Sequence, residues 1–387
     1  MEITDYGMSR ERGFLSHYEI DAVTLPPRFD ETLRAANNLS GLLSTGRIRH
    51  WLHMLPDPVL EDWVISAPDE ELRTAMVHYS FLVQAYVWGE TIPPAALPAN
   101  LARPIAALAK QLGQAPLLPY SGYVLDNWAR LDKHGPIALD NIFMYQNFAG
   151  GDDENWFVLI HVAIEAQAGV LLDNAVKLVD AAHSGNAGEA ERLLTEMEGA
   201  WENIYEIFKR MPERCDPYIY FQRVRPYIHG WANNPALGGG LIYEGVDAFG
   251  GMPQALRGQT GSQSSIVPAM DALFGVTHSD DPLKSFLDEL HNYRPVLHRR
   301  FIDDLARQSN LRTFVELSDI QSLKNAFNRC TEQVARFRTR HLEYAASYIN
   351  KQAANVPGND PDVGTGGTPF MKYLKKHRDE NRAQTVA

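Results

Sequence analysis

Two histidines lie where long amphipathic helices should place apolar side chains. His341 occurs in the segment ARFRTRHLEYAASYI, in phase with the apolar positions of a helix expected over residues 318–352. His161 occurs in WFVLIHVAIE, in the middle of another expected helix. A single histidine on an apolar helix face is most often a core residue hydrogen-bonded to a neighbour. Two of them, on two long helices, suggest a cofactor held between the helices.

Of the cofactors considered, haem requires the fewest protein ligands. It needs one neutral imidazole on a rigid element beside an apolar pocket. Arg338 and Arg340 flank His341 and have the charge to pair with haem propionates, although solvated surface charge accounts for them equally well. A di-metal helix bundle would need inward glutamates and Glu-x-x-His pairs. Neither His341 nor His161 has that spacing, so the sequence favours haem.

The run YIYFQRVRPYIHGW contains a second group of candidate residues. Tyr220 and Phe221 precede Arg225 by about one helical turn. An aromatic wall beside a guanidinium suits an aromatic amino acid, with its ring on the wall and its carboxylate on the guanidinium. The spacing is equally typical of an ordinary amphipathic surface helix.

A glycine-rich segment, GTGGT at residues 364–368, comes after a stretch of Gly, Pro and Asp that we expect to be mobile, near residues 355–368. It lacks the GK[ST] ending of a phosphate-binding loop and no strand precedes it. Such a segment is most often a linker. Its functional interpretation is a lid whose backbone N–H groups and Thr365 hydroxyl meet a substrate on closure.

The elements that must position these residues are mostly helices. We predict a mainly α fold, with a small, mixed, mostly helical N-terminal domain over residues 1–148 and a large helical haem-binding domain over residues 149–387. Helices are expected over residues 68–88 (capped by Ser66), 104–112, 153–185, 187–211, 282–309 in two pieces separated at Pro295, and 318–352.

Composition limits the classes of partner and compartment. The 387-residue chain has a formal charge of −12, which disfavours nucleic acids and anionic membranes as partners. Its two cysteines, Cys215 and Cys330, exclude a disulfide framework and a Cys-rich zinc site, and they fit a reducing cytoplasm. The N-terminus has no signal-peptide pattern, and the most apolar run, residues 156–172, is interrupted by polar side chains. We therefore expect a cytoplasmic protein in which this run is a buried helix.

The motifs together resemble the indoleamine 2,3-dioxygenase family, from about residue 115 to 380, with a less clear match in the N-terminal third. The segments that carry the resemblance are PYSGYVLDNW, WFVLIHVAIEA, FQRVRPYIHGWANNPALGGGLIYEGV, GSQSSIVPAMDALFG, FRTRHLEYAASYI and GTGGTPFMKYL. The resemblance implies haem b between a small mixed domain and a large helical one. It also implies that both atoms of O2 are inserted across the indole C2–C3 bond of L-tryptophan, giving N-formylkynurenine, with an unidentified reductant keeping the iron ferrous.

The resemblance also implies a role for individual residues. His341 would be the proximal iron ligand, and Arg338, paired with Asp271, would meet a haem propionate. The substrate carboxylate would bind Arg225. The residues implied around the indole and the distal haem face are Tyr220 and Phe221 on one wall, Tyr120 and Tyr123 on the other, Thr260 and Gly261 near the haem, and Thr365 closing over the amino acid.

Three positions depart from the mammalian pattern of the family. His161 stands where those enzymes carry Ser, and we expect it to accept a hydrogen bond from the indole N–H, as the distal histidine does in tryptophan 2,3-dioxygenases. Tyr220 replaces a Phe, and Tyr123 replaces a smaller residue. The alternatives that stay open are a haem oxygenase of the same fold acting on another aromatic substrate, a non-catalytic haem or indole sensor, and a haem-free helical interaction protein.

Overall fold

The structure, a computed structural model, describes residues 1–58, 60–277, 282–353, 375–376, 378–380 and 382–387. It is mainly helical, as the sequence predicts, and its strands are short. Strand β1 (Ala96–Leu97) pairs in parallel with β4 (Ile242–Tyr243), and β2 (Trp128–Arg130) pairs antiparallel with β3 (Ile142–Met144). The predicted domain boundary near residue 148 stays a prediction, because buried residues from both sides of it belong to one hydrophobic core.

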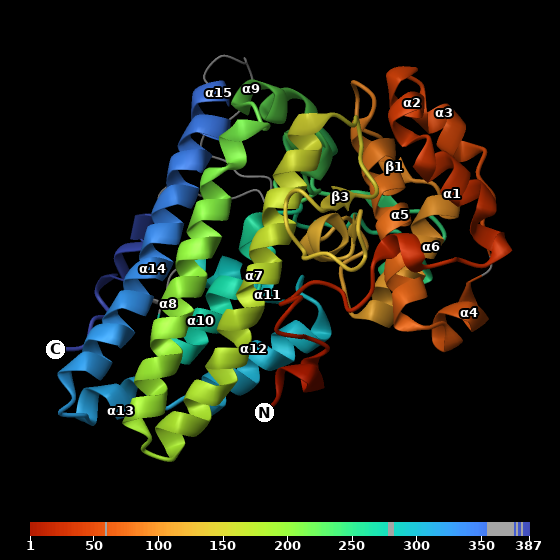
Figure 1. The fold of residues 1–387 in the computed structure, drawn as a ribbon. Helices are drawn as coiled ribbons and strands as arrows, with labels where there is room; N and C mark the ends of the chain where they lie inside the picture. The colour runs from red at the N-terminus through yellow and green to blue at the C-terminus, as the bar shows by residue number, and fades with distance from the viewer. Residues whose placement is uncertain (59, 278–281, 354–374, 377, 381) are drawn as a thin grey trace.

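The N-terminal helices gather on one side of the molecule (Figure 1). They are α1 (Asp30–Asn37), α2 (Leu39–Ser44), α3 (Ile48–His53), α4 (Glu61–Ser66), α5 (Asp69–Trp88) and α6 (Ala99–Leu112). Helix α5 is buried along nearly its whole length, from Leu72 to Val87, so it is apolar on all faces and forms the centre of this part. The three carboxylates in its first turn interact favourably with the positive N-terminal end of the helix dipole.

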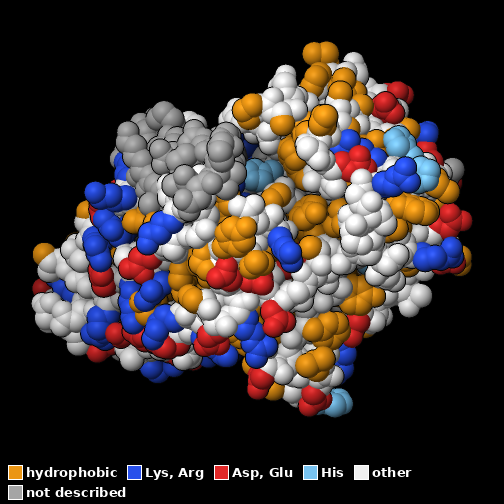
Figure 2. Space-filling model, turned by 90° about the horizontal axis from the view of Figure 1, so that it is seen from above, with side chains coloured by type: hydrophobic (Ala, Val, Ile, Leu, Met, Phe, Trp, Pro, Cys, Tyr) orange, Lys and Arg blue, Asp and Glu red, His pale blue; other side chains and the backbone are white. Residues whose placement is uncertain are grey.

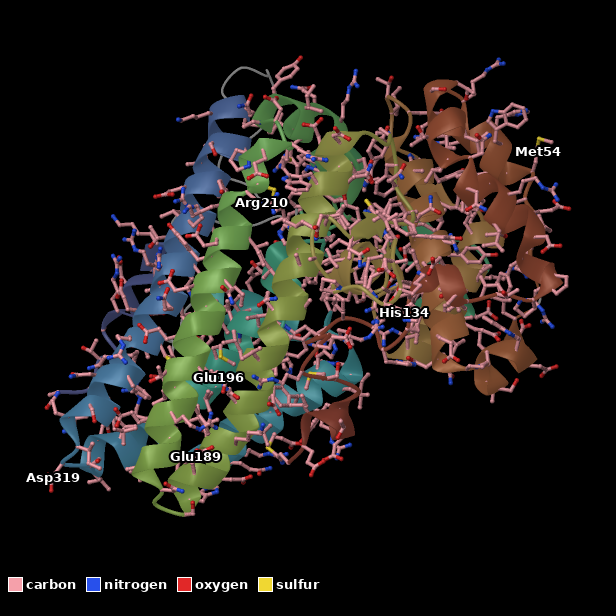
Figure 3. The ribbon with its side chains drawn as sticks, viewed as in Figure 1. Met54, His134, Glu189, Glu196, Arg210 and Asp319 are labelled. Carbon is pink, nitrogen blue, oxygen red and sulfur yellow. The ribbon has the colours of Figure 1, made fainter. Side chains whose placement is uncertain are left out.

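Three long helices run side by side in the other part of the molecule (Figure 1). Helix α7 (Asp152–His183) packs on α8 (Ala187–Lys209), and α8 packs on α14 (Gln321–Ala345). The outer face of α8 carries charged side chains such as Glu189, while Leu193, Trp201 and Phe208 are buried on its inner face (Figure 3). The remaining α-helices here are α9 (Pro217–Ile219), α10 (Ile266–Phe274), α11 (Pro282–His291), α12 (Val296–Gln308), α13 (Leu311–Leu317) and α15 (Lys351–Ala353).

The apolar run in α7 behaves as expected for a core helix. Within the described residues, α7 is the helix long and apolar enough to cross a membrane, with a mean hydropathy of 1.5 over its most apolar window. That window is 72% buried inside the protein. The apolar composition of α7 is thus explained by its burial between α8 and the rest of the core.

Several helix boundaries differ from the prediction. Helix α6 begins at Ala99, capped by Pro98, so Pro104 lies inside the helix rather than starting it. Ser66 ends α4 and does not cap α5, whose N-cap is Pro68. Ile320, expected in the buried stripe of the last long helix, is 44% exposed because it precedes the first helical turn. Residues 282–309 do form two helices separated at Pro295.

Within the described part of the chain, three π-helical turns interrupt the helical regions. They are Ser121–Leu125, Tyr220–Val224 and Ala346–Asn350. The first and second carry residues that the sequence assigns to the substrate pocket, and the third continues α14 beyond His341. Because a π-turn inserts an extra residue, it shifts the side chains after it by one position around the helix. Such turns occur frequently at functional sites.

The N-terminal segment crosses α7 at very close range. A Cβ atom added to Gly169 would overlap the carbonyl group of Arg10, and one added to Gly13 would overlap the carbonyl oxygen of Glu165. Gly13 also has φ +56, in the left-handed region. Both glycines are therefore required for the backbone of residues 9–13 to lie against the α7 turn that contains Glu165.

Replacement of Gly169 by Ala tests this close approach. We expect Gly169→Ala to lower the free energy of unfolding by about 1–3 kcal/mol, since the two backbones must separate. Gly199→Ala is the matched control, because Gly199 is exposed in the middle of α8 and an added Cβ there meets no atom within 4 Å. The control should be stabilised by about 0.5–1 kcal/mol. Urea denaturation of both variants measures the difference, and equal stability would contradict the tight crossing.

Candidate active site

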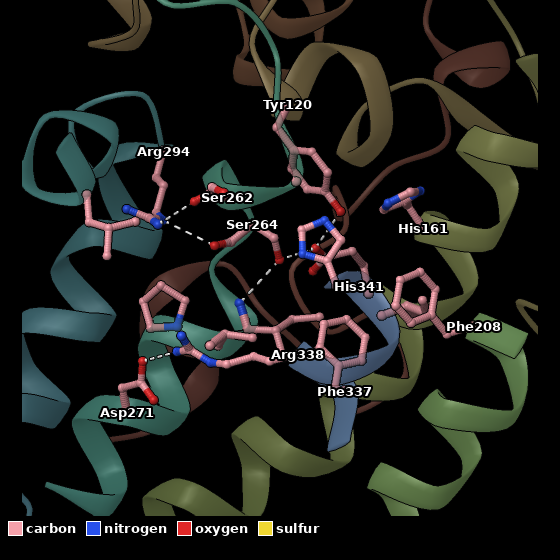
Figure 4. Close-up of a pocket in the computed structure, with 17 residues that line it drawn as sticks. Tyr120, His161, Phe208, Ser262, Ser264, Asp271, Arg294, Phe337, Arg338 and His341 are labelled. Carbon is pink, nitrogen blue, oxygen red and sulfur yellow. Dashed lines mark hydrogen bonds and ion pairs between the residues drawn. The ribbon is translucent and has the colours of Figure 1, made fainter. Parts of the chain in front are cut away.

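A cavity lies among α7, α8, α10, α11, α14 and the loop before α10 (Figure 4). It encloses about 890 Å³ of space free of atoms, part of it open to solvent. Seen from above, the surface has a recess in which a histidine side chain is visible (Figure 2). The apolar side chains of the cavity wall are Ile164, Phe208, Ile266, Val267, Pro268, Leu287 and Phe337. Its lining, mostly apolar with a few polar groups, is that of a site for a small molecule or cofactor.

His341 faces this cavity from α14, toward His161 on α7 (Figure 4). Neither of its ring nitrogens makes a hydrogen bond within the described part of the chain. Burial lowers its pKa to about 4, with smaller contributions from His161 and Arg338. The imidazole is thus neutral at physiological pH and keeps a lone pair, which is the form that binds a metal.

His161 is held in one tautomer. Its Nδ1 lies 2.7 Å from the carbonyl oxygen of Phe157, one turn earlier in α7. A carbonyl only accepts, so Nδ1 carries the proton and Nε2 is left as an acceptor. Burial also lowers the pKa of His161, which keeps the ring neutral. This histidine therefore offers a hydrogen-bond acceptor beside the cavity.

Arg338 forms a buried ion pair at the cavity wall. Its Nη2 lies 2.6 Å from Oδ2 of Asp271 on α10, and both side chains are largely shielded from solvent. Both residues line the cavity. The carboxylate fixes the orientation of the guanidinium, which has further N–H groups for a second anion.

Glu165 is a carboxyl group buried in the cavity wall, one turn after His161. Its Oε1 accepts hydrogen bonds from the Tyr120 hydroxyl at 2.8 Å and the Ser264 hydroxyl at 2.7 Å. Its Oε2 is buried without a hydrogen-bond partner in the described residues. Burial raises its pKa to about 7, partly offset by the two hydrogen bonds. One carboxyl group thus joins α7, the segment before the first π-turn and the loop before α10.

Arg294 reaches the cavity from the junction of α11 and α12. It is 2% exposed and donates to two backbone carbonyls, from Nη2 to Ser262 at 2.9 Å and from Nε to Ser264 at 3.3 Å. Burial lowers its pKa to about 10. The loop before α10 is therefore held on one side by Glu165 and on the other by Arg294.

Three of the four predicted aromatic residues, Tyr123, Tyr220 and Phe221, lie outside the cavity lining, whereas Tyr120 belongs to it. The ring of Phe157 is 4.7 Å from that of His161 and 4.8 Å from that of Tyr220, measured between centroids. Tyr123 is fully buried, 6.4 Å from Phe157. The guanidinium of Arg225 lies 5.3 Å over the ring of Phe221. Tyr123 and Tyr220 thus belong to an aromatic layer outside the cavity lining, and this layer contacts His161 through Phe157.

Comparison with known proteins decides the family. The family model of indoleamine 2,3-dioxygenase matches residues 2–384. The chain belongs to the indoleamine 2,3-dioxygenase family. It is 30% identical to indoleamine 2,3-dioxygenase 1 of Rattus norvegicus, over 98% of this chain and 95% of the relative. It is also 30% identical to the indoleamine 2,3-dioxygenase of Saccharomyces cerevisiae, over 83% and 80% of the two chains.

The family match extends the resemblance seen in the sequence. A less clear match was expected in the N-terminal third, yet the family model covers that third as well. Indoleamine 2,3-dioxygenase acdA of Aspergillus candidus, 30% identical over 92% of this chain, is a further relative. Membership makes the chain an oxidoreductase of a family of haem dioxygenases.

The cavity residues fit the haem that indoleamine 2,3-dioxygenases bind. The neutral His341 has no hydrogen-bond partner in the described residues, and the surrounding wall is apolar, as an axial ligand requires. No group of three or more His, Cys, Asp or Glu able to hold a metal ion is present among those residues. Haem needs only one such ligand, so the donor set suits haem and no bare metal ion.

The predicted site residues divide into three sets. Six of them line the cavity: Tyr120, His161, Gly261, Asp271, Arg338 and His341. Five do not line it: Tyr123, Tyr220, Phe221, Arg225 and Thr260, the last of which caps the short 3₁₀-helix Gly261–Gln263. Thr365 and the segment 355–368 lie outside the described residues.

Sequence reasoning missed Phe157, Glu165 and Arg294. A signal existed for the first two, since they precede and follow His161 by four residues and so share its helix face. Glu165 was treated only as an interruption of an apolar run. No spacing rule points to Arg294, which belongs to a connection between helices.

Replacement of Glu165 by Gln tests the buried carboxyl group. Glu165 is protonated in both states at low pH, but between about pH 4.5 and 7 only the unfolded chain releases the proton, so the folded state loses relative stability as pH rises. Gln stays neutral and can accept the same two hydrogen bonds. The variant should therefore match wild-type stability near pH 4 and exceed it by about 1–3 kcal/mol at pH 8.

Chemical denaturation of the haem-free proteins at several pH values measures this difference. The comparison at pH 4 is the internal control for packing, because both side chains are uncharged there. A difference in stability that does not change with pH would show that Glu165 ionises freely in the folded protein.

Proposed function

We propose that this member of the indoleamine 2,3-dioxygenase family binds haem b through His341 and cleaves the indole C2–C3 bond of L-tryptophan, or of a close indole derivative, with O2. The product is N-formylkynurenine. The observation that carries the proposal is the neutral imidazole of His341, without a hydrogen bond to any described residue, facing a large apolar cavity opposite His161. Ferrous haem, when bound, supplies the activation of O2.

The chain's own residues have binding and orienting tasks in this reaction. His341 would hold the haem iron through a ring nitrogen, and Arg338, held by Asp271, would pair with a haem propionate. His161 accepts the indole N–H at Nε2, because Nδ1 is engaged by Phe157. The apolar wall excludes water from the reacting indole. No acid–base pair is required for these tasks.

The amino acid part of the substrate is assigned to the layer behind His161. Arg225 is 4% exposed and burial lowers its pKa, so a carboxylate that reached it would form a desolvated ion pair. Tyr220 and Phe157 extend an aromatic surface from His161 toward Arg225.

A single-turnover experiment tests the reaction. The haem-loaded protein is reduced without oxygen and then mixed with O2 and L-tryptophan, and the absorbance of N-formylkynurenine is monitored. Product formation supports the proposal. Haem binding without consumption of O2 would indicate a sensor, and turnover of another aromatic compound alone would indicate a different substrate.

Replacement of His341 by Gly tests the ligand. We expect the variant to lose its Soret band on gel filtration, because the iron loses its protein ligand. Added imidazole should restore the band by occupying the space left, which a merely misfolded protein would not permit. His161→Ala is the control and should retain haem. An undiminished Soret band in His341→Gly would rule out this residue as the ligand.

Replacement of His161 by Ala tests substrate selection. Wild-type protein should prefer tryptophan over 1-methyltryptophan, because methylation removes the proton that His161 Nε2 accepts. One hydrogen bond contributes about 1 kcal/mol. The kcat/KM for tryptophan divided by that for 1-methyltryptophan should therefore fall by about 5-fold in the variant. Equal turnover of the two compounds by the wild type would contradict this role.

A further inference from the structure

The guanidinium of Arg294 is a buried charge in the cavity wall without a carboxylate partner in the described part of the chain. Other shielded guanidinium groups of the protein have one: Arg73 lies 2.5 Å from Asp126, Arg130 2.7 Å from Glu19, and Arg338 2.6 Å from Asp271. Among the described residues, Arg294 contacts the carbonyl oxygens of Ser262 and Ser264 and, at 3.5 Å, Nδ1 of His291. It thus differs from these three guanidinium groups, whose buried charge is paired with a carboxylate.

Two carbonyl groups do not use the full capacity of this side chain. A guanidinium has five N–H donors in a planar fork that matches a carboxylate. Two of them are engaged at 2.9 and 3.3 Å, and the contact with His291 is long. Burial lowers the pKa of Arg294, and no neighbouring carboxylate among the described residues offsets that effect. The side chain therefore has both unused donors and an uncompensated charge beside the cavity.

The nearby carboxyl groups of the cavity are engaged elsewhere. Asp271 pairs with Arg338. Glu165 accepts the hydroxyl of Ser264, while Arg294 takes the backbone carbonyl of the same serine, so this residue separates the two groups. No carboxylate among the described residues is left to neutralise Arg294, so an anion bound in the cavity could take that place.

We propose that Arg294 binds one of the two haem propionates, while Arg338 binds the other. The inference rests on the proposed haem site and adds a second, unassigned cofactor-binding residue to it. In the close-up view, Arg294 and the Arg338–Asp271 pair lie on one side of the cavity, and His161 and Phe208 lie on the other (Figure 4). Two guanidinium groups on one side suit the two carboxylates that haem carries on one edge. The substrate carboxylate has a separate guanidinium in Arg225.

Titration of the haem-free protein with two porphyrins tests the assignment. Haemin carries two propionates, and haemin dimethyl ester carries none. Arg294→Met removes the charge with little change of volume, and we expect it to weaken haemin binding by about 10- to 100-fold, as for the loss of a charged hydrogen-bonded pair. Its affinity for the dimethyl ester should equal that of the wild type. Arg294→Lys, which keeps the charge, should retain more haemin affinity than Arg294→Met.

A purely structural role predicts a different pattern. If Arg294 only ties the loop before α10, Arg294→Met will weaken binding of both porphyrins equally and lower the melting temperature of the haem-free protein. On the proposed role, the variant loses affinity for haemin but not for the dimethyl ester, whatever the loss of its two hydrogen bonds to the loop does to the melting temperature. Equal weakening for both porphyrins overturns the inference.

A measurement without any change at residue 294 covers the case in which the variants do not fold. Arg338→Met with haemin loses one ion pair, whereas wild type with the dimethyl ester loses two. The second loss of affinity should exceed the first; equal losses overturn the assignment of Arg294. Should the two losses be equal while the wild-type protein still binds haemin with an imidazole-ligated spectrum, the haem proposal stands and only the role of Arg294 is overturned. Failure of the wild type to bind haemin overturns both.

Discussion

A neutral imidazole with no hydrogen-bond partner in the described residues, facing an apolar cavity, is the feature on which the rest of the site depends. The side chain of His341 is half-buried, so its ring nitrogens remain accessible from the cavity. His341 is kept neutral by burial and faces the cavity rather than a packed wall. The surrounding helices thus keep this imidazole neutral, with a lone pair available toward the cavity.

The long helices place this ligand, but short irregular segments complete the cavity. Glu165 accepts hydroxyl groups from Tyr120 and Ser264, so a single side chain of α7 fixes two segments that have no regular structure of their own. Gln263 adds a hydrogen bond from the backbone of Tyr120 at 2.9 Å. The wall opposite α14 is therefore held by buried polar contacts, which specify geometry more strictly than apolar packing does.

Helical periodicity in the sequence predicted much of the fold correctly. The long helices, the break at Pro295 and the inward direction of His341 and His161 all arise from apolar spacing, which the structure reproduces. Periodicity failed where a π-turn shifts the phase, and it could not show that Tyr220 packs on Phe157 behind the cavity instead of lining it. Periodicity could not predict that Arg294 lines the cavity, because the position of this residue depends on how α11 and α12 meet.

The charges of the cavity form a consistent set. Burial keeps His161 and His341 neutral and raises the pKa of Glu165 to about 7, so that in mildly acidic solution this carboxyl group is uncharged as well. Arg338 and Arg294 contribute two positive charges, and Asp271 contributes one negative charge. The cavity is then net positive within a chain whose formal charge is −12. An anionic occupant would offset this excess positive charge, and a porphyrin with two carboxylates matches both the apolar wall and the charge of the cavity.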